Sequence, residues 1–368
     1  VSAKCRADSS SLLRVKMEVL TMAWLVVTLP NAAHHVAPCT LGRNTLSTQT
    51  RFKYLLAATA VIGLLLGNVL FSKTPPPKPI ERPNFLLVIT DDQSWKHPSF
   101  AGYPAVKTGY VGRIIPRGEF HDGQSMVNHF HYVVKRAAEQ HIMVNSHESS
   151  RPTGMHRTYP NYIAAEAARG NEFNSWSNGN PPMHETILPF TRLLGGPMDY
   201  TPGIFEIKMS LYDKSKKEQV HTTLAKQLAL YVTMYSPLQM AADLPENYEK
   251  YPDAFQFIKD VAADWDDSKY LEAEPGDYLT VARKAKGKED WFLGAITDEN
   301  ARSTEIKLEF LTPGKKYQAI VYQDGSDADW EKNPKSYVIK TIQVNSKSKI
   351  KLHLAKGGGT AISFKPIN

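Results

Sequence analysis

The stretch Ile142-Met-Val-Asn-Ser-His-Glu148 decides how this sequence is interpreted. It begins as a short apolar run, which is typical of a buried strand, and it follows Gly123–Gln140, where apolar residues recur at helical spacing. A helix followed by a buried strand is one unit of an α/β fold. His147 and Glu148 then lie at the carboxyl end of the strand, where α/β proteins bind their ligands. The sequence therefore predicts a functional site at this strand end.

Three carboxylates occur in this region, with Glu166 eighteen residues after Glu148 and Glu172 six residues after Glu166. We expect Glu166 to lie on a short helical run. Glutamates are also common on ordinary surfaces, so Glu148 and Glu166 have a plain alternative as solvated charges. What favours a site is that they come soon after a buried strand and beside His147.

Composition excludes some classes of protein. The 368-residue chain contains 42% hydrophobic residues, which is enough for a large core. Its net charge of +7 includes no run of Lys and Arg interleaved with aromatic residues, so we expect no nucleic-acid partner. The two cysteines, Cys5 and Cys39, both precede the globular part, which therefore has neither a disulfide framework nor a thiolate metal site. The sequence leaves the oligomeric state open.

The N-terminal part predicts export. Residues 1–50 have no coherent periodicity, and we expect disorder or a non-native extension there. Residues 51–73 form a signal or membrane anchor, because a basic start precedes the uncharged run 54–71, with a buried core helix as the alternative. Residues 74–83 are a Pro-rich linker. We therefore expect a protein of the periplasm or cell envelope, with membrane contact through 54–71 as an option.

A first resemblance concerns residues 84–108. Arg82-Pro-Asn-Phe-Leu-Leu-Val-Ile-Thr-Asp-Asp-Gln-Ser-Trp95 resembles the opening strand of the sulfatase family, in which the Asp pair binds calcium. That family needs a Cys or Ser in a Cys/Ser-x-Pro-x-Arg motif downstream, as the precursor of formylglycine. The motif does not follow here, so we interpret 84–108 as a sulfatase-like fragment and not as part of a working sulfatase.

The remaining chain divides into two segments with different periodicity. Residues 109–263 alternate strands and helices, which predicts about four βα units, or the C-terminal half of a (β/α)8 barrel. We expect strands at Tyr110–Ile115, Ile142–Ser146 and Leu238–Ala242, and helices at Gly123–Gln140, Glu185–Leu194, Glu218–Tyr235 and Pro245–Val261, the last interrupted by Pro252.

Residues 264–368 have a period of two, which predicts an antiparallel β-sandwich. Seven strands are expected: Asp277–Arg283, Trp291–Ile296, Glu305–Leu311, Tyr317–Tyr322, Tyr337–Ile342, Ile350–Leu354 and Gly359–Phe364. The fold class is therefore α/β plus all-β. The sandwich shows no chemistry of its own, so we expect it to pack beside the barrel, with carbohydrate contact as the weaker alternative.

A second resemblance is longer. The blocks that carry it are Lys107-Thr-Gly-Tyr-Val-Gly112, Ile115-Pro-Arg-Gly-Glu119, Met126-Val-Asn-His129, His147-Glu148, Arg151-Pro-Thr-Gly154, Arg157-Thr-Tyr-Pro-Asn161, Ala168-Arg-Gly-Asn-Glu172 and Gly196-Pro-Met-Asp-Tyr-Thr-Pro-Gly203. From about Val106 to the C-terminus the chain resembles glycoside hydrolase family 97, a family of bacterial α-glucosidases and α-galactosidases. The resemblance implies an N-terminal β-sandwich, a central barrel, a C-terminal β-domain and a Ca²⁺ ion in the active site.

The resemblance also implies roles for individual residues. Glu172 matches the general acid, and Glu148 matches a calcium ligand that helps to activate water. Glu166 matches a further calcium ligand, and His147 matches a sugar-contacting residue. The implied metal set is therefore Glu148, Glu166 and Glu172. Gly109 stands where the retaining branch has a nucleophilic Asp, so the sequence resembles the inverting branch.

The chain departs from that family before Val106. The stretch upstream does not resemble the N-terminal sandwich or the first barrel strands, and we hypothesise a fusion or misassembly at Val106–Thr108. We therefore expect a calcium-dependent, inverting α-glucosidase that acts on α-linked glucosides or oligosaccharides, impaired by the missing half of its barrel. A non-catalytic carbohydrate-binding envelope protein is the alternative, and a sulfatase-related protein is a more distant one.

Overall fold

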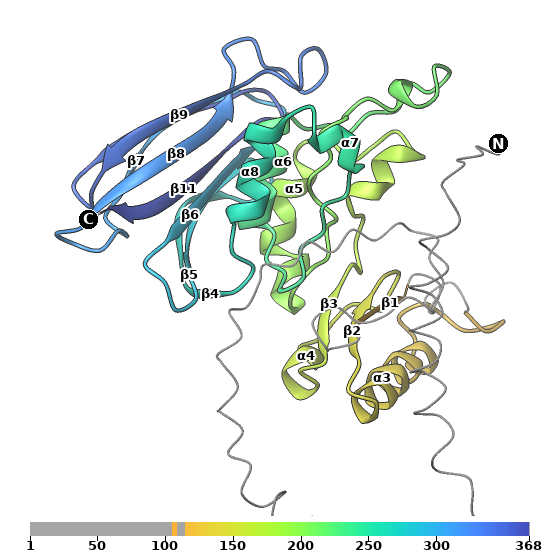
Figure 1. Cartoon of the computed structure of the whole chain (residues 1–368). Coiled ribbons are helices and arrows are strands. Elements are labelled where there is room, and N and C mark those ends of the chain that lie inside the picture. Colours follow the sequence, from red (N-terminus) through yellow and green to blue (C-terminus); the bar gives the residue numbers. More distant parts are fainter. Residues whose placement is uncertain (1–104, 109–114, 368) are drawn as a thin grey trace, which may run out of the picture. The chain divides into compact units, whose positions relative to one another are not determined.

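The computed structural model of the chain describes residues 105–108 and 115–367 (Figure 1). The strands are β1 (Ala105–Thr108), β2 (Met143–Ser146), β3 (Tyr162–Ala165), β4 (Trp265–Glu274), β5 (Tyr278–Ala285), β6 (Trp291–Thr297), β7 (Arg302–Lys307), β8 (Lys316–Asp324), β9 (Tyr337–Val344), β10 (Lys349–Leu354) and β11 (Gly359–Ile367). The α-helices are α3 (Gln124–Glu139), α4 (Met155–Thr158), α5 (His184–Ile187), α6 (Leu224–Thr233), α7 (Pro245–Tyr248) and α8 (Pro252–Asp260). Four short 3₁₀ helices are η2 (Asn171–Ser175), η3 (Leu188–Phe190), η4 (Arg192–Gly195) and η5 (Met209–Leu211).

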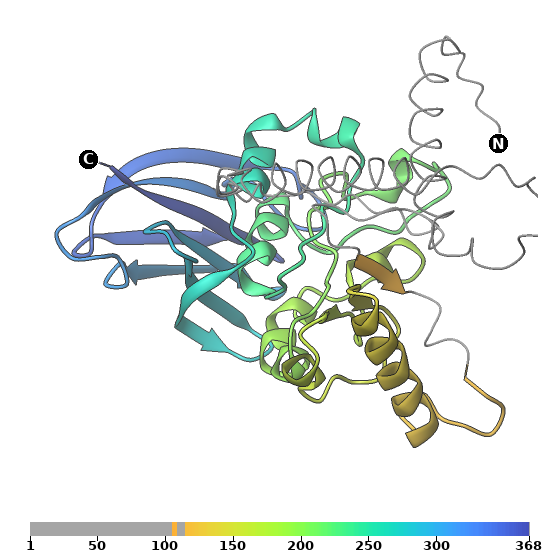
Figure 2. The ribbon, with the colours of Figure 1, turned by 60° about the horizontal axis from the view of Figure 1, so that its bottom comes forward.

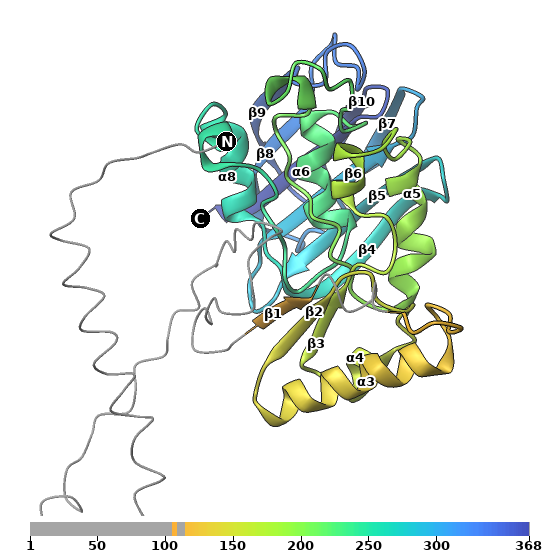
Figure 3. The same ribbon diagram turned by 90° about the vertical axis from the view of Figure 1, so that its right-hand side faces the viewer.

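The first sheet is parallel, with the strand order β1-β2-β3. The chain at Met198 adds to it, because Met198 forms a parallel bridge with Ala165 of β3. Helix α3 covers the sheet, and Val134 of this helix packs in a small core with Val144 and Tyr162. In Figure 3, α3 runs alongside the three strands. This arrangement of parallel strands with a covering helix is the partial barrel that the sequence predicts.

Strand β3 corrects one prediction. Glu166 directly follows the strand Tyr162–Ala165 and does not lie on a short helical run. Three of these four strand residues are buried, because a parallel strand of this kind is covered on both faces. Such a strand is apolar without a period of two, so its pattern cannot be told from that of a buried helix.

The C-terminal part contains an antiparallel six-stranded sheet with the order β4-β5-β6-β11-β8-β9. The two-stranded ribbon β10-β7 packs on one face of it, where Ile350 and Leu352 of the ribbon share a core with Leu293 and Phe364 of the sheet. The predicted antiparallel sandwich is confirmed, and its seven expected strands are present, although the one expected at Glu305–Leu311 is found at Arg302–Lys307. In Figure 2 the strands of this part are coloured from teal, for β4, to dark blue, for β11. The sequence reading missed β4, the edge strand, because most of its side chains are only half-buried or exposed.

Helix α6 covers the other face of the six-stranded sheet (Figures 1 and 3). All ten residues of α6 are buried, and Leu228 belongs to a core that also contains Phe292 of β6. Two glycines permit the close approach: a Cβ at Gly294 would lie 2.7 Å from the Ala229 carbonyl oxygen, and one at Gly359 would lie 2.7 Å from the Lys226 Cα. The core therefore continues across residue 264, where we placed a domain boundary.

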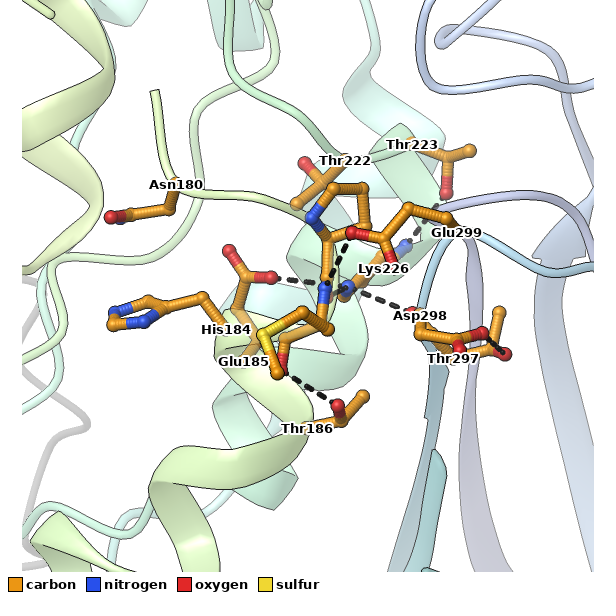
Figure 4. Close-up of polar contacts among 12 residues, drawn as sticks. Asn180, His184, Glu185, Thr186, Thr222, Thr223, Lys226, Thr297, Asp298 and Glu299 are labelled. Carbon is orange, nitrogen blue, oxygen red and sulfur yellow. Dashed lines mark hydrogen bonds and ion pairs between the residues drawn. The ribbon is translucent and has the colours of Figure 1, made fainter. Parts of the chain in front are cut away.

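A buried ion pair lies at this junction (Figure 4). Lys226 of α6 is fully buried, and its Nζ lies 3.1 Å from Glu185 Oε2 of α5. The same Nζ donates hydrogen bonds to the carbonyl oxygens of Pro182, at 2.7 Å, and Thr297, at 2.9 Å. Tyr200 donates its hydroxyl hydrogen to Glu185 Oε1 at 2.5 Å. One ammonium group therefore connects α5, α6 and the end of β6.

The remaining helices differ from the prediction in their extent. The helix expected at Glu218–Tyr235 begins only at Leu224, because the Thr223 side chain caps it by accepting a hydrogen bond from Lys226 N at 3.2 Å. The helix expected at Glu185–Leu194 is broken into α5, η3 and η4, with Pro189 at the first break. The break at Pro252 separates α7 from α8 as expected.

The remaining predictions either differ from the structure or fall outside the described residues. Of the strand expected at Leu238–Ala242, the structure describes only a β-bridge at Met240, and none of the named strands includes these residues. The strand at Tyr110–Ile115 falls almost entirely outside the described residues, as do the predictions for 1–50, 51–73, 74–83 and most of 84–108. Among the helices that the structure describes, none has both the length and the apolar character needed to span a membrane.

Candidate active site

A cavity of about 660 Å³ opens at the carboxyl ends of β2 and β3. It is lined by Ile115, His121, Asp122, His147, Glu148, Ser149, Arg151, Glu166, Ala167, Ala168, Arg169, Gly170, Glu172, Phe173 and Trp176. The structure therefore brings together all four residues that the sequence singled out. They come from three places: His147 and Glu148 follow β2, Glu166 follows β3, and Glu172 lies on η2.

The ends of the two strands are fixed to each other. Glu166 N donates a hydrogen bond to the Ser146 carbonyl oxygen at 2.9 Å, and the Glu166 carboxylate accepts one from the backbone of Glu148. Glu148 and Ala167 both have positive φ, at 44° and 46°. Left-handed backbone is uncommon for such residues and is frequent at functional sites. These two backbone conformations orient the chain so that the carboxylates of Glu148 and Glu166 line the cavity.

Glu166 lies in an environment that disfavours its charge. Burial raises the pKa of its carboxyl above the usual range, and the nearby carboxylates of Glu172 and Asp199 raise it further. The imidazole of His147 and the backbone N–H of Glu148 act in the opposite direction. A proton or a cation held beside Glu166 would relieve the repulsion.

His147 forms the buried floor of the cavity. Its Nε2 lies 2.8 Å from Asp199 Oδ2, which also accepts a hydrogen bond from Asn145 Nδ2 at 2.5 Å. A carboxylate at this position accepts Nε2–H, so in the neutral ring the lone pair is on Nδ1. Nδ1 lies 3.5 Å from Glu166 Oε2. Asp199 thus orients His147.

Three of the lining residues form a group that could hold a metal ion. One ligand atom each of His147, Glu166 and Glu172 lies within 4.8 Å of the other two. Glu148, which we expected among the metal ligands, is not part of this group, although it lines the same cavity. Two carboxylates suit a hard cation such as Ca²⁺, whereas an imidazole nitrogen is not a usual calcium ligand.

Glu172 is carried by a turn that the core holds in place. Buried Asn171 donates from Nδ2 to the Thr201 carbonyl oxygen and to Gln227 Oε1, both at 3.1 Å. Asn174 accepts a hydrogen bond from Asn180 N at 2.8 Å. These buried amides lie on either side of Glu172 in sequence. The position of the Glu172 backbone is therefore determined by the protein interior and not by a mobile surface loop.

Arg192 lies outside the cavity and holds the backbone that carries Glu166. The sequence analysis missed this residue. Its guanidinium donates to the carbonyl oxygens of Ala165, Glu166, Gly196 and Pro197, at distances of 2.6 to 3.1 Å. Burial lowers the pKa of Arg192 to about 10. The guanidinium thereby fixes the end of β3 to the neighbouring segment. No pattern near Arg192 in the sequence distinguishes it from a surface arginine.

The rim of the cavity is both charged and aromatic. Arg151 lies with its Nε 3.5 Å from Asp122 Oδ2, and His121 lies with Nε2 2.7 Å from the Glu148 carbonyl oxygen. On another part of the rim are Phe173 and the exposed ring of Trp176. The cavity thus combines a floor of carboxylates and imidazole with a rim that is charged on one part and aromatic on another.

Comparison with known proteins shows which family domains the chain carries. Residues 90–168 match the family described as glycoside hydrolase 97, and residues 264–365 match the one described as glycosyl-hydrolase 97 C-terminal, oligomerisation. The chain carries glycoside hydrolase family 97 domains. The first match begins at residue 90 and so covers most of 84–108. The sulfatase origin that we expected for this stretch is therefore not supported.

Relatives of known name are similar to the chain over part of their length. A retaining alpha-galactosidase of Bacteroides thetaiotaomicron is 34% identical over 73% of this chain and 39% of its own length. A probable retaining alpha-galactosidase of Streptomyces bingchenggensis is 31% identical over 51% of this chain and 27% of its own. Solved structures of a glycoside hydrolase family 97 enzyme from Pseudoalteromonas sp. strain K8, in complex with panose or acarbose, are 48% identical. They have a TM-score of 0.67 and cover 72% of this chain and 42% of theirs.

Proposed function

We propose that this glycoside hydrolase family 97 cavity hydrolyses α-linked glucosides or oligosaccharides, with Glu172 as the general acid and Glu148 as the base that activates water. The observation that carries the proposal is that both carboxylates line one cavity from separate elements, above a floor formed by His147 and Glu166. Hydrolysis with inversion needs an acid at the leaving oxygen and a base on the opposite face, with room for water between them.

An α-glucoside is the substrate class that the comparisons favour. The Pseudoalteromonas enzyme, at 48% identity, was solved with panose and acarbose, whereas the curated α-galactosidases are 34% and 31% identical. We therefore expect faster hydrolysis of p-nitrophenyl α-glucoside than of the corresponding α-galactoside. The reverse order would favour the activity named for the curated relatives.

Calcium binding is part of the same proposal. Glu166 and Glu172 would hold the ion, because their carboxyl groups lie in one group. Glu172 would contact the ion through one oxygen and carry the proton of the general acid on the other. Burial, together with the Glu172 carboxylate, raises the pKa of Glu166, and a bound cation would act in the opposite direction. A bound Ca²⁺ would offset the repulsion between the carboxylates and polarise water or a sugar hydroxyl. His147, held by Asp199, would contact the sugar. Glu148 stays a candidate ligand from the sequence resemblance, at a position adjacent to the group.

The stereochemical outcome is the most specific part of the proposal. Inversion is favoured by Gly109, since glycine offers no nucleophile where the retaining branch has Asp. The curated relatives are both named as retaining enzymes. Proton NMR of the first product distinguishes the outcomes. Initial release of β-glucose from an α-glucoside supports inversion, and initial release of α-glucose shows retention.

The central test is hydrolysis of panose by the purified chain in calcium. Slow but measurable release of glucose is expected, and Glu172→Gln should reduce it by at least about 100-fold, the lower range for loss of a general acid. Glu309→Gln is the matched control, because the Glu309 side chain is 76% exposed and lies outside the cavity. If panose binds but neither the chain nor its variants release glucose, the carbohydrate-binding alternative is favoured and the enzymatic proposal fails.

Export remains a proposal that rests on residues 54–71. The uncharged run after a basic start supports a periplasmic or envelope location, free or anchored to a membrane. Fractionation of a bacterium that expresses the complete chain tests it. Recovery of the protein only in the cytoplasmic fraction would contradict export.

A further inference from the structure

Trp176 is a large apolar residue whose side chain is exposed to solvent. Its side chain is 58% exposed, although it directly follows η2, whose backbone is held by buried amides. Burial of a tryptophan ring removes a large apolar area from water and is therefore favourable. An exposed tryptophan on a fixed turn gains this free energy when a ligand covers it. Trp176 also lines the cavity that contains the carboxylates.

Neighbouring residues contact the indole and the turn that carries it. The rings of Phe173 and Trp176 form a T-shaped pair with a centroid distance of 6.5 Å and an interplanar angle of 80°. Arg169 in turn lies over the Phe173 ring, with its guanidinium carbon 4.5 Å from the centroid. Lys216 Nζ, from a distant loop, donates a hydrogen bond to the Ser175 carbonyl oxygen at 3.2 Å. The turn that carries the ring is therefore held in place before any ligand binds, which lowers the entropy cost of binding.

The position of Trp176 relative to Glu172 indicates which part of a ligand it would meet. Both residues lie on the same 3₁₀ turn or at its end, and both line the cavity. A general acid protonates the oxygen that joins the cleaved sugar to the leaving group. The leaving group must therefore depart on the side of Glu172. We propose that Trp176 forms the stacking platform for the leaving-group sugar of an α-linked oligosaccharide.

This inference rests on the proposed function and adds a specificity-determining residue to it. The axial C–H groups on one face of a pyranose are apolar, and they pack well on the flat face of an indole. The polar ring hydroxyls at the edge would then lie near Arg169, which is exposed beside Phe173. Trp176 should therefore strengthen binding of oligosaccharides without affecting a ligand that has no second sugar.

The test compares two ligands by calorimetric titration of the full chain in calcium. Panose has sugars beyond the one that is cleaved off, whereas methyl α-glucoside has only a methyl group there. Trp176→Ala should weaken panose binding about tenfold, equivalent to roughly 1.4 kcal/mol, and leave methyl α-glucoside binding unchanged. Trp176→Phe should restore part of the panose affinity. Tyr132→Ala is the matched control, because Tyr132 is 62% exposed on α3 and does not line the cavity.

Each other outcome overturns the inference in a recognisable way. Unchanged panose affinity in Trp176→Ala would show that the ring does not contact the ligand, while the proposed function stands. An equal loss for both ligands, with an unchanged thermal midpoint, would place the ring at the cleaved sugar. A lowered midpoint with loss of both ligands would show a structural role. Failure of the unmodified chain to bind either sugar would refute the proposed function itself.

Discussion

Arg192 illustrates how much of the site depends on one residue outside the cavity. Replacement of Arg192 by Lys should destabilise the protein by roughly 2–4 kcal/mol, because an ammonium group cannot reach the four carbonyl oxygens that the guanidinium fork satisfies. Urea unfolding measures the change. The control is Arg136→Lys, since Arg136 is 60% exposed and its exchange should cost less than about 0.5 kcal/mol. Equal effects of the two exchanges would contradict the role of Arg192.

Asp324 gives a prediction for pH dependence. It is buried, and it accepts hydrogen bonds from Ala355 N and Gly359 N. Burial raises the pKa of its carboxyl to about 7. Between about pH 4 and 7 the folded state therefore holds a proton that the unfolded chain has lost, so the free energy of unfolding falls as the pH rises. The contribution is fully present below pH 4 and is lost as the pH rises through 7.

Asp324→Asn isolates this contribution, since the amide oxygen can still accept both hydrogen bonds. The stability of the unmodified protein relative to Asp324→Asn should fall by more than about 1 kcal/mol between about pH 4.5 and about pH 7.5. Subtracting the unfolding free energies of the two proteins at each pH removes the contributions of the other titrating groups. Parallel stability curves for the two proteins would show that Asp324 does not titrate in this range.

At the scale of residues, the sequence identified the carboxylates but not their partners. Glu148 could be singled out by its position after a predicted strand, and the family resemblance marks Glu148, Glu166 and Glu172. Asp199 could not be assigned, because it meets His147 only when chain segments 52 residues apart are folded together. Pairing at that separation leaves no pattern in a single sequence.

Helix α6 packs on the six-stranded sheet, and its start is set by one side chain. Thr223→Ala should lower stability by about 1 kcal/mol, because the cap to Lys226 N is lost. Thr223→Ser keeps a hydroxyl and should change stability by only a few tenths of that amount. Thermal or urea unfolding compares the pair. A serine variant as unstable as the alanine variant would show that the methyl group, not the cap, matters.

Secondary structure was predictable where one face of an element meets water. Helix α3 and strand β10 follow their patterns, since buried and exposed residues alternate at the helical or strand period. Strand β3 did not, because it is almost entirely buried and has no period. Strand β4 was missed for the opposite reason: an edge strand whose side chains are all either half-buried or exposed gives little apolar signal.

At the scale of the whole described part, the ion pair at Lys226 connects the partial barrel to the six-stranded sheet. Lys226→Met should destabilise the protein by roughly 3–5 kcal/mol, because it leaves the buried Glu185 carboxylate without its cation. Adding Glu185→Gln should recover part of that loss, since the second exchange removes the uncompensated charge. A double variant as unstable as the sum of both single variants would contradict this coupling.

The arrangement of the two parts was only half predictable. The change of period near residue 264 correctly indicated a partial barrel followed by a sandwich. The shared core could not be predicted, because Leu228 and Phe292 each look like ordinary core residues of their own segment. Which surfaces meet is decided by shape, here by the glycines at 294 and 359 that admit α6.

Calorimetry with calcium and panose tests the central claim most directly, namely that Glu166 and Glu172 hold a cation that makes the cavity bind sugar. The unmodified chain should bind Ca²⁺, and panose should bind at least about tenfold more tightly in calcium than in chelator. Glu166→Gln should lose both effects, and Glu309→Gln should retain them. Panose affinity that is the same with calcium and with chelator, or undiminished calcium binding by Glu166→Gln, would contradict the account.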